Sequence, residues 1–359
     1  MRTNAMKRIF TYLVLLVVFV VAGGAYFIWQ QYETFLNKPL LANEETVFTI
    51  QSGSNIRNVA KQLKAKGLFA SQPHELITPD LFFVAHARLE KKAAKIKAGE
   101  YALQANMLPD ELLDLFVSGK TLQYQIGFIE GRSFKEIVAA VKKHPHLEQT
   151  LSDEDYSNIM VKLGADPNTK PEGWFFPDTY NFPRNTTDFD VLKRSYETMR
   201  TYLQSAWEKR QPNPYLKTPY EALTLASIVE KETGVPEERP LIAGVFLNRL
   251  KKGMLLQTDP TVIYGMGDRY KGNIRKKDLR TDTPYNTYTR KGLPPTPIAT
   301  PGKAAIDAVF NPQKSDMLYF VATGMGDGKH YFSKTYKEHR KAVIKYQLNG
   351  KKSRYQGDK

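Results

Sequence analysis

Cysteine is absent from the 359-residue chain. This absence excludes disulfide bonds, cysteine nucleophiles and thiolate metal sites. Histidine is also scarce, with six residues, and the closest pair, His144 and His146, is separated by a proline. No spacing typical of a metal site occurs, so we expect no bound metal.

Complete glycine fingerprints for nucleotide binding are missing as well. The two glycine clusters, at residues 265–267 and 324–328, lack the third glycine of a dinucleotide site and the strand-to-helix context that it requires. They are typical of turns. We therefore expect an enzyme or binding protein that works without a cofactor.

Acidic residues are in deficit, with 37 against 52 basic residues and a formal charge of +15. Such a surface favours anionic partners, which include nucleic acid, anionic lipid headgroups and acidic cell-wall polymers. Hydrophobic residues make up 42% of the chain and aromatic residues 12%, which is enough for a folded core.

Charged residues are also absent from Ile9 to Trp29, directly after Lys7 and Arg8. An apolar run of this length predicts a transmembrane helix, and the positive flank predicts a cytoplasmic N-terminus with the rest of the chain on the outer side of the membrane. Nucleic acid is then not an expected partner. A cleaved signal peptide with its small-residue site at 22–25 is the alternative, although the apolar run is longer than a usual signal.

The remaining patterns predict an α+β protein. We expect a cytoplasmic tip and anchor at 1–30, a linker at 31–44, a small module at 45–123 and a larger mixed α+β domain at 124–359. A short strand, a polar turn and an amphipathic helix recur three times. These pairs are 47–50 with 56–66, 99–103 with 109–117, and 125–129 with 134–142.

Residues 172–180, EGWFFPDTY, gather aromatic side chains with two acids. Such clusters usually belong to a core, although aromatic rings also stack on sugars. A helix is expected from 188 to 209.

Residues 221–233, EALTLASIVEKET, predict an apolar helix that ends near Glu232. Glu232 follows Val229, Ile228 and Leu225 by three, four and seven positions, so it extends the apolar stripe. Apolar neighbours and the negative end of the helix should both raise its pKa, as a general acid requires. The alternative is a helix-terminal glutamate that bends out to water.

A second helix is expected from Pro236 to about Lys252, which makes a helical hairpin with Glu232 near the bend. Glu230 points to a different face, and we expect it to be a supporting neighbour that pairs with a basic residue. Beyond Gly253, frequent proline and glycine predict loops and short strands that form a binding groove. A strand at 317–323 and a helix at 334–348 should close the chain.

Several of these stretches together resemble one known family. They are ASIVEKET, FLNRL, LQTDPTVIYGMG, PYNTY, GLPP with IATPG, and EGWFFPDTY. They are similar to the endolytic murein transglycosylases of the YceG-like (MltG) family, over most of residues 30–345. In addition, VFTIQSGSNIRNVAKQL resembles the start of a LysM module, which binds cell-wall glycan. A module that merely spaces the catalytic part from the membrane is the alternative.

The resemblance implies a lytic transglycosylase anchored in the inner membrane. Such an enzyme cleaves the β-1,4 bond after N-acetylmuramic acid in nascent peptidoglycan, leaves 1,6-anhydro ends and terminates elongation. The family's catalytic acid corresponds to Glu232, on a helix that resembles that of lysozyme-like transglycosylases. Peptidoglycan synthases are further partners that it implies.

One carboxyl group can serve as acid and then as base if the substrate's own N-acetyl group stabilises the anomeric carbon. We expect Gln257, Asn286 and Tyr288 to bind N-acetyl groups, with Tyr264 as a wall of the site. Ser227, Asp178 and His330 are further candidates for lining it. Asp259 is expected to cap a turn before Pro260 and to bind substrate.

Two other functions stay open. A glycan hydrolase would use Glu232 with Asp259 as its second carboxylate. A non-catalytic scaffold would only bind the wall.

Overall fold

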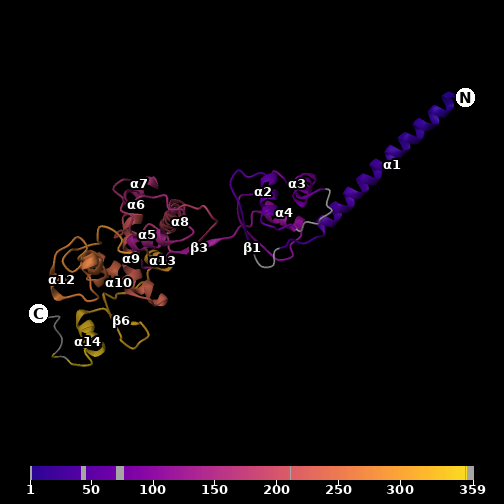
Figure 1. The fold of residues 1–359 in the computed structure, drawn as a ribbon. Helices are drawn as coiled ribbons and strands as arrows, with labels where there is room; N and C mark the ends of the chain where they lie inside the picture. The colour runs from indigo at the N-terminus through magenta and orange to yellow at the C-terminus, as the bar shows by residue number, and fades with distance from the viewer. Residues whose placement is uncertain (1, 42–45, 70–76, 211, 352, 354–359) are drawn as a thin grey trace. The chain divides into compact units, whose positions relative to one another are not determined.

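The computed structural model describes residues 2–41, 46–69, 77–210, 212–351 and 353. The chain divides into two compact units, Met1–Tyr124 and Gln125–Lys359 (Figure 1). Helices and short two-stranded sheets make up both units, which confirms the α+β class.

The first unit begins with helix α1 (Arg2–Leu36), of which Met6–Leu36 is long and apolar enough to cross a membrane. The helix does not stop where the apolar run ends. It continues beyond Trp29, and Phe35 and Leu40 are buried in the core of the module that follows. The first part of the segment expected as a linker is therefore helical and packed, while residues 42–45 lie outside the described residues.

The rest of this unit is a small α+β module. Its elements are β1 (Thr46–Ile50), α2 (Ile56–Ala65), α3 (Pro79–Leu89), β2 (Gly99–Leu103) and α4 (Pro109–Ser118). Strands β1 and β2 pair antiparallel, with Phe48 opposite Tyr101, and both rings are buried against Phe116. Asn55 caps α2 by accepting a hydrogen bond from the Asn58 backbone N–H. The first two predicted strand-and-helix pairs are confirmed, and α3 is an additional element.

The remaining elements belong to the second unit, except that β3 begins at the last residue of the first unit. They are β3 (Tyr124–Gly127), α5 (Phe134–Lys143), α6 (Asp153–Ser157), α7 (Ile159–Lys162), β4 (Thr179–Phe182), α8 (Asp188–Lys209), α9 (Pro219–Glu232), η1 (Pro236–Glu238), α10 (Arg239–Lys251), α11 (Asp259–Met266), η2 (Gly267–Arg269), α12 (Lys276–Arg280), α13 (Lys303–Phe310), β5 (Tyr319–Ala322), β6 (His330–Ser333) and α14 (Tyr336–Tyr346). The third predicted pair is confirmed as β3 and α5, but β3 pairs with β4. The three similar segments are therefore not a structural repeat.

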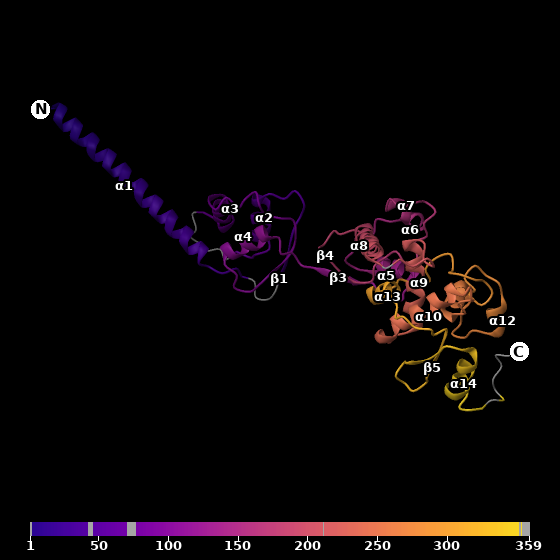
Figure 2. The ribbon, with the colours of Figure 1, turned by 180° about the vertical axis from the view of Figure 1, so that it is seen from behind.

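Helix α9 is the centre of this unit. It packs against α8, α10, α11 and α13 (Figure 2). Every residue from Ala222 to Val229 is buried. Most of these residues are apolar, so the apolar surface of α9 is wider than the stripe expected on one face. The two polar ones, Thr224 and Ser227, donate hydrogen bonds to backbone carbonyls of the same helix. The helical hairpin predicted from α9 and the segment after Pro236 is confirmed.

The aromatic segment 172–180 belongs to the core. Phe175 is fully buried and stacks on Phe134, with ring centroids 4.9 Å apart. Trp174 stacks on Tyr220 at 5.9 Å. These contacts tie the segment to α5 and α9 and confirm the packing interpretation.

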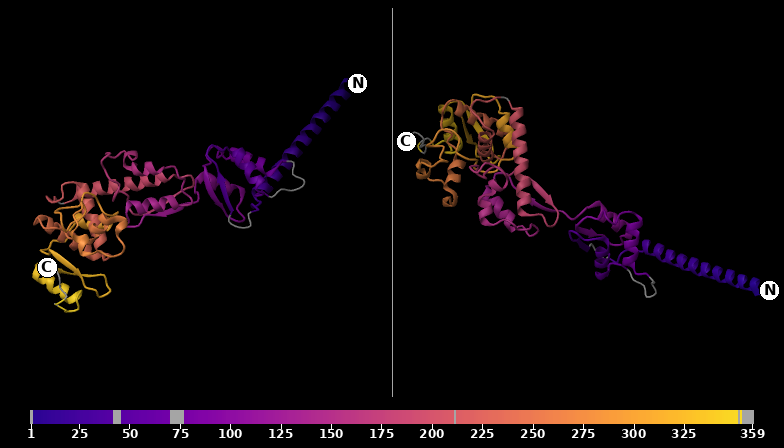
Figure 3. Two further views of the ribbon diagram at one scale, coloured as in Figure 1. Left: turned by 60° about the vertical axis from the view of Figure 1, so that its left-hand side comes forward. Right: turned by 90° about the horizontal axis from the view of Figure 1, so that it is seen from above.

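The segment after Gly253 contains more helix than expected. Asp259 does not cap a turn, because it is the first residue of α11. Pro260 suits the first turn of a helix, where its missing N–H costs nothing, and an aspartate there faces the positive helix end. The predicted C-terminal strand and helix are confirmed as β5 and α14, which group with β6 in the yellow segment of Figure 3.

Candidate active site

A cavity of about 610 Å³ lies at the C-terminal end of α9. Its lining residues come from the ends of α9 and α10, the start of α11, and β5, β6 and α14. The cavity is lined by Glu232, Arg249, Leu256, Gln257, Thr258, Asp259, Tyr288, Tyr319, Phe320, Val321, Ala322, His330, Tyr336, His339, Val343 and Gln347.

Glu232 is the last residue of α9 and is half-buried. Thr258 donates a hydrogen bond from Oγ1 to Glu232 Oε1. Burial raises the pKa of Glu232, and the nearby charge of Asp259 adds to this effect. The Thr258 hydrogen bond and the charges of His330 and Arg249 act in the opposite direction, but burial prevails. The carboxyl group therefore holds its proton at a higher pH than an ordinary glutamate does.

Thr258 is held by two other buried threonines. Its backbone N–H donates to Thr287 Oγ1 at 3.1 Å, and Thr261 Oγ1 donates to the Thr258 carbonyl at 2.8 Å. The hydroxyl oxygens of Thr261 and Thr287 lie 2.9 Å apart. This threonine network fixes the hydroxyl that contacts Glu232.

Gln257, Asp259 and Tyr288 also line the cavity. Gln257 has a positive φ of 50°, an unusual backbone conformation for a residue other than glycine. Its backbone N–H donates to the Thr287 carbonyl at 3.1 Å, which holds this conformation. Tyr288 donates a hydrogen bond from its hydroxyl to Asp259 Oδ1 at 2.5 Å. Three of the predicted substrate contacts therefore lie together with Glu232.

Arg249 supplies positive charge beside the carboxyl group, and His330 also lines the cavity. Arg249 is buried and donates to the backbone carbonyls of Leu318 at 2.7 Å and Leu256 at 2.6 Å. Nδ1 of His330 lies 2.7 Å from Glu238 Oε2. Contacts with other parts of the protein hold both side chains, so their positions do not depend on Glu232.

The other predicted lining residues do not reach this cavity. Ser227 is fully buried, donates to the Thr224 carbonyl and accepts from the Ile298 backbone N–H. The Asn286 amide donates to three backbone carbonyls of the 278–281 segment. Asp178 accepts from the Thr179 backbone N–H. Ser227 and Asn286 therefore make their hydrogen bonds within the protein, and Asn286 also holds a cavity residue, because its Oδ1 accepts from the Tyr288 backbone N–H at 2.9 Å.

Glu230 supports the site from the opposite face of α9. Its Oε1 lies 3.3 Å from Arg239 Nη2, and its Oε2 accepts from the Gly302 backbone N–H at 2.9 Å. The expected pairing with a basic residue is confirmed. This contact attaches the start of α13 to the end of α9.

Tyr264 contacts a second buried acid. Its hydroxyl donates to Glu172 Oε2 at 3.0 Å, and Glu172 Oε1 accepts from the Phe134 backbone N–H at 2.9 Å. Burial raises the pKa of Glu172 to about 7. Glu172 thereby joins α5 to α11, whose first residue, Asp259, lines the cavity.

Glu172 should make the stability of the protein depend on pH. The folded chain keeps this proton up to about pH 7, whereas the unfolded chain loses it near the ordinary value of 4.5. The free energy of unfolding should therefore fall as pH rises from 4.5 to about 7. Glu172→Gln should remove about 3 kcal/mol of that fall. The variant should match the wild type at low pH and be more stable at pH 8 in thermal unfolding.

Glu136→Gln is a control with the opposite sign. Burial alone would raise the pKa of Glu136, but hydrogen bonds from Ser133 and Arg132 hold this pKa below its usual value. Removing this carboxylate should lower stability at neutral pH. If Glu172→Gln and the wild type differ in stability by the same amount at low pH and at pH 8, the raised pKa of Glu172 is contradicted.

The sequence did not point to Thr258, Arg249 or His339. Arg249 follows Val245 by one helical turn, and this spacing would place it on the buried face of α10. The lysines that follow it in the sequence suggest an exposed basic end of the helix instead. The His339 ring stacks on Tyr319 at 5.1 Å, and its Nδ1 has no hydrogen-bond partner among the described residues. It reaches the site only through the tertiary packing of α14.

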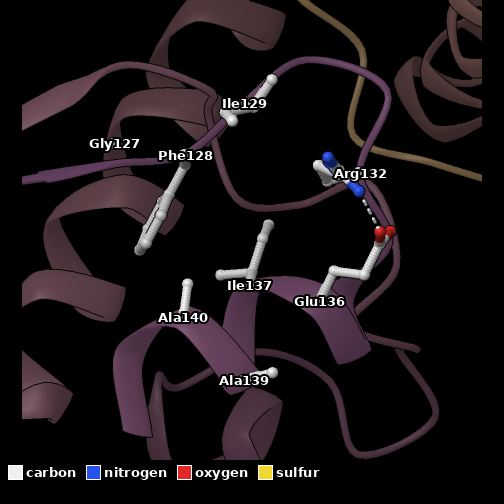
Figure 4. A pocket seen from close by; sticks show the side chains of 8 residues that line it. All are labelled: Gly127, Phe128, Ile129, Arg132, Glu136, Ile137, Ala139 and Ala140. Carbon is white, nitrogen blue, oxygen red and sulfur yellow. Dashed lines mark hydrogen bonds and ion pairs between the residues drawn. The ribbon is translucent and has the colours of Figure 1, made fainter. Parts of the chain in front are cut away.

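A second, smaller cavity of about 290 Å³ lies between β3 and α5 (Figure 4). Apolar side chains form it, and the ion pair of Arg132 and Glu136, 2.5 Å apart, lies at its edge. It contains no predicted site residue. The 610 Å³ cavity is therefore the better candidate for catalysis. Among the described residues, no three His, Asp or Glu side chains are placed to hold a metal ion.

Comparison with known proteins finds consistent relatives. The profile of the YceG-like family matches residues 48–345. The endolytic murein transglycosylase of Bacillus subtilis is 33% identical over 91% of this chain and 91% of its own length. The protein of that name from Streptococcus pneumoniae is 30% identical over 91% of this chain and 63% of its own length. A crystal structure of a YceG-like protein from Listeria monocytogenes is similar, with a TM-score of 0.51, 31% identity, and coverage of 83% of this chain and 99% of that one.

Proposed function

This chain belongs to the YceG-like family, and from that premise we propose that it is a lytic transglycosylase that cuts peptidoglycan glycan strands internally. One observation carries the proposal beyond the names of the relatives. Glu232, whose carboxyl pKa is raised by burial, lines a cavity of about 610 Å³. A cavity of this volume is large enough to bind a small ligand.

In the first step, Glu232 is the general acid. Its proton passes to the glycosidic oxygen, and the bond between this oxygen and the anomeric carbon breaks. The N-acetyl oxygen of the same sugar bonds to the anomeric carbon and takes up the positive charge. A raised pKa suits this step, because Glu232 must be protonated when the substrate binds.

In the second step, the ionised Glu232 is the general base. It takes the proton of the C6 hydroxyl, whose oxygen attacks the anomeric carbon and displaces the N-acetyl oxygen. The 1,6-anhydro ring closes, and Glu232 regains its proton. No water is consumed, so the reaction needs no second catalytic carboxylate.

The neighbours of Glu232 tune these two steps. The Thr258 hydroxyl and the charges of Arg249 and His330 stabilise the ionised form, so the carboxyl group can release its proton despite burial. A carboxyl group without such neighbours would be a poor base. We assign Thr258 a positioning role, since its hydrogen bond also orients the carboxyl group.

Substrate binding is proposed for Gln257, Asp259 and Tyr288, which line the cavity with Glu232. Tyr288 and Asp259 are hydrogen-bonded to each other and can face polar groups of a sugar as a pair. The remaining predicted residues are proposed to act indirectly, by hydrogen bonds that hold neighbouring segments in place. They are Tyr264, Asn286 and Ser227.

The N-terminal part completes the proposal. Helix α1 anchors the chain in the inner membrane, with the N-terminus in the cytoplasm and the catalytic unit in the periplasm. The module after it, with its LysM-like first strand and helix, binds glycan or spaces the active site from the membrane. Peptidoglycan synthases are proposed partners.

An Asp259→Asn variant separates the lyase from a hydrolase, because Asp259 is a carboxylate in the same cavity. We expect the variant to keep making anhydro ends, with activity reduced by less than about tenfold. Loss of the negative charge should lower the pKa of Glu232, so activity should decline at a lower pH than in the wild type. Mass spectrometry of the products and reducing-end assays measure both properties. A loss of about a thousandfold, with reducing ends in the wild-type digest, would support the hydrolase.

A further inference from the structure

The last turns of α1 are packed into the N-terminal module. The Tyr32 hydroxyl lies 2.7 Å from His86 Nδ1, and the rings of Phe35 and Phe82 stack at 5.8 Å. Phe35, Phe82 and His86 are all buried. The proposed membrane anchor and α3 therefore form one packed body.

Helix α3 runs back along α1 toward the proposed membrane. Phe82 contacts both Phe35 and Tyr32, and His86, one turn later, contacts Tyr32. Leu89 lies three residues beyond His86, and Trp29 lies three residues before Tyr32. Each of these separations of three residues corresponds to about 4.5 Å of helical rise. The end of α3 therefore reaches the level of Trp29, where the apolar run of α1 ends.

The exposed end of α3 is both apolar and basic. We call it the α3 tip and define it as Arg88, Leu89, Glu90, Lys91 and Lys95, which are all exposed. Leu89 has 68% of its surface exposed. The three cations outnumber the single acid. An exposed leucine among lysine and arginine residues is the composition of a segment that rests in a lipid headgroup layer.

We propose that the α3 tip rests on the leaflet from which α1 emerges, with Leu89 in the headgroup layer and the cations of the tip on anionic phospholipid phosphates. The exposed Trp29 ring would lie at the same level, where aromatic side chains favour the membrane interface. This contact rests on the proposed anchoring by α1. It would fix the orientation of the module on the membrane instead of leaving it free to swing.

Single spin labels test this contact in the full-length protein, which has no native cysteine to remove. Leu89→Cys reports the tip. Leu81→Cys is the matched control, because Leu81 is on the same helix, is 56% exposed and lies two turns farther from the proposed membrane. Val18→Cys, in the middle of the apolar run, reports the anchor. The protein is placed in nanodiscs, and label collisions with oxygen and with a water-soluble nickel complex are compared.

We expect oxygen to dominate collisions at position 18 and the nickel complex to dominate at position 81. Position 89, in the headgroup layer, should have a ratio of oxygen to nickel collisions clearly between these two. If position 18 lies in the bilayer but 89 behaves like 81, the tip contact is wrong and the anchor stands. If position 18 is in water, the proposed anchor fails as well. Transglycosylase activity, measured separately, is independent of both outcomes.

A comparison of lipids tests the proposed contact between the cations of the α3 tip and anionic phospholipids. Nanodiscs of phosphatidylcholine alone are compared with nanodiscs that also contain phosphatidylglycerol. The label at 89 should lie deeper in the anionic nanodiscs, and Lys91→Glu together with Lys95→Glu should abolish the difference. Equal depth in both lipids would overturn the phosphate contact.

Discussion

Replacing Glu232 by glutamine should lower the release of anhydro-ended fragments by about a thousandfold. The amide has nearly the shape of the acid but can neither give its proton to the glycosidic oxygen nor take one from the C6 hydroxyl. Binding of glycan strands should change little, because the cavity keeps its other side chains. The measurement is the initial rate on purified glycan strands, with binding followed separately by co-sedimentation.

Glu230→Gln is the matched control for this variant. It makes the same change two residues earlier on α9, in a side chain that contacts Arg239 and Gly302. Because Glu230 does not line the cavity, its variant should keep the wild-type rate to within a few-fold. Wild-type activity in Glu232→Gln would exclude Glu232 as the acid and leave the wall-binding scaffold as the better function.

Thr258→Val should have the second-largest effect. This change removes the hydroxyl that donates to Glu232 Oε1 while keeping the size of the side chain. A hydrogen bond to a charged group is worth about 1.5–3 kcal/mol, so the rate constant of the chemical step should fall by about 10- to 100-fold. The Michaelis constant should change less, since substrate contacts remain.

The pH profile distinguishes this role from a general loss of structure. The Thr258 hydrogen bond opposes the raised pKa of Glu232, so its removal should raise that pKa further. Activity requires the protonated form at the start, and its decline at high pH should therefore move to higher pH in Thr258→Val. Thr258→Ser keeps the hydroxyl and should restore both rate and profile. An unchanged profile in Thr258→Val would contradict the positioning role.

Local patterns were sufficient for those parts of the site that depend on one segment. The apolar helix that ends at Glu232 and the hairpin after it follow from side-chain periodicity and from Pro236. A turn was expected at Asp259, but a helix begins there. A proline after an aspartate begins turns and helices alike, and only the packing of α11 against α9 decides between them.

Contacts between distant segments could not be predicted in this way. Thr258 reaches Glu232 across 26 positions, and α14 contributes His339 from more than 100 positions away. Asn286, in a polar, turn-rich segment, and Ser227, a polar residue in the apolar helix before Glu232, look like substrate-binding residues in the sequence. The backbone groups that they bind become visible only in the folded chain.

The fate of water in the reaction tests the one-carboxylate mechanism most directly. Glycan strands are digested with the wild-type protein in heavy-oxygen water, and the new ends are analysed by mass spectrometry. If Glu232 acts as acid and then as base, the new N-acetylmuramic acid ends are anhydro, carry no heavy oxygen and show no added mass of water. Ends that carry one heavy oxygen from the start of the reaction would contradict it and indicate hydrolysis.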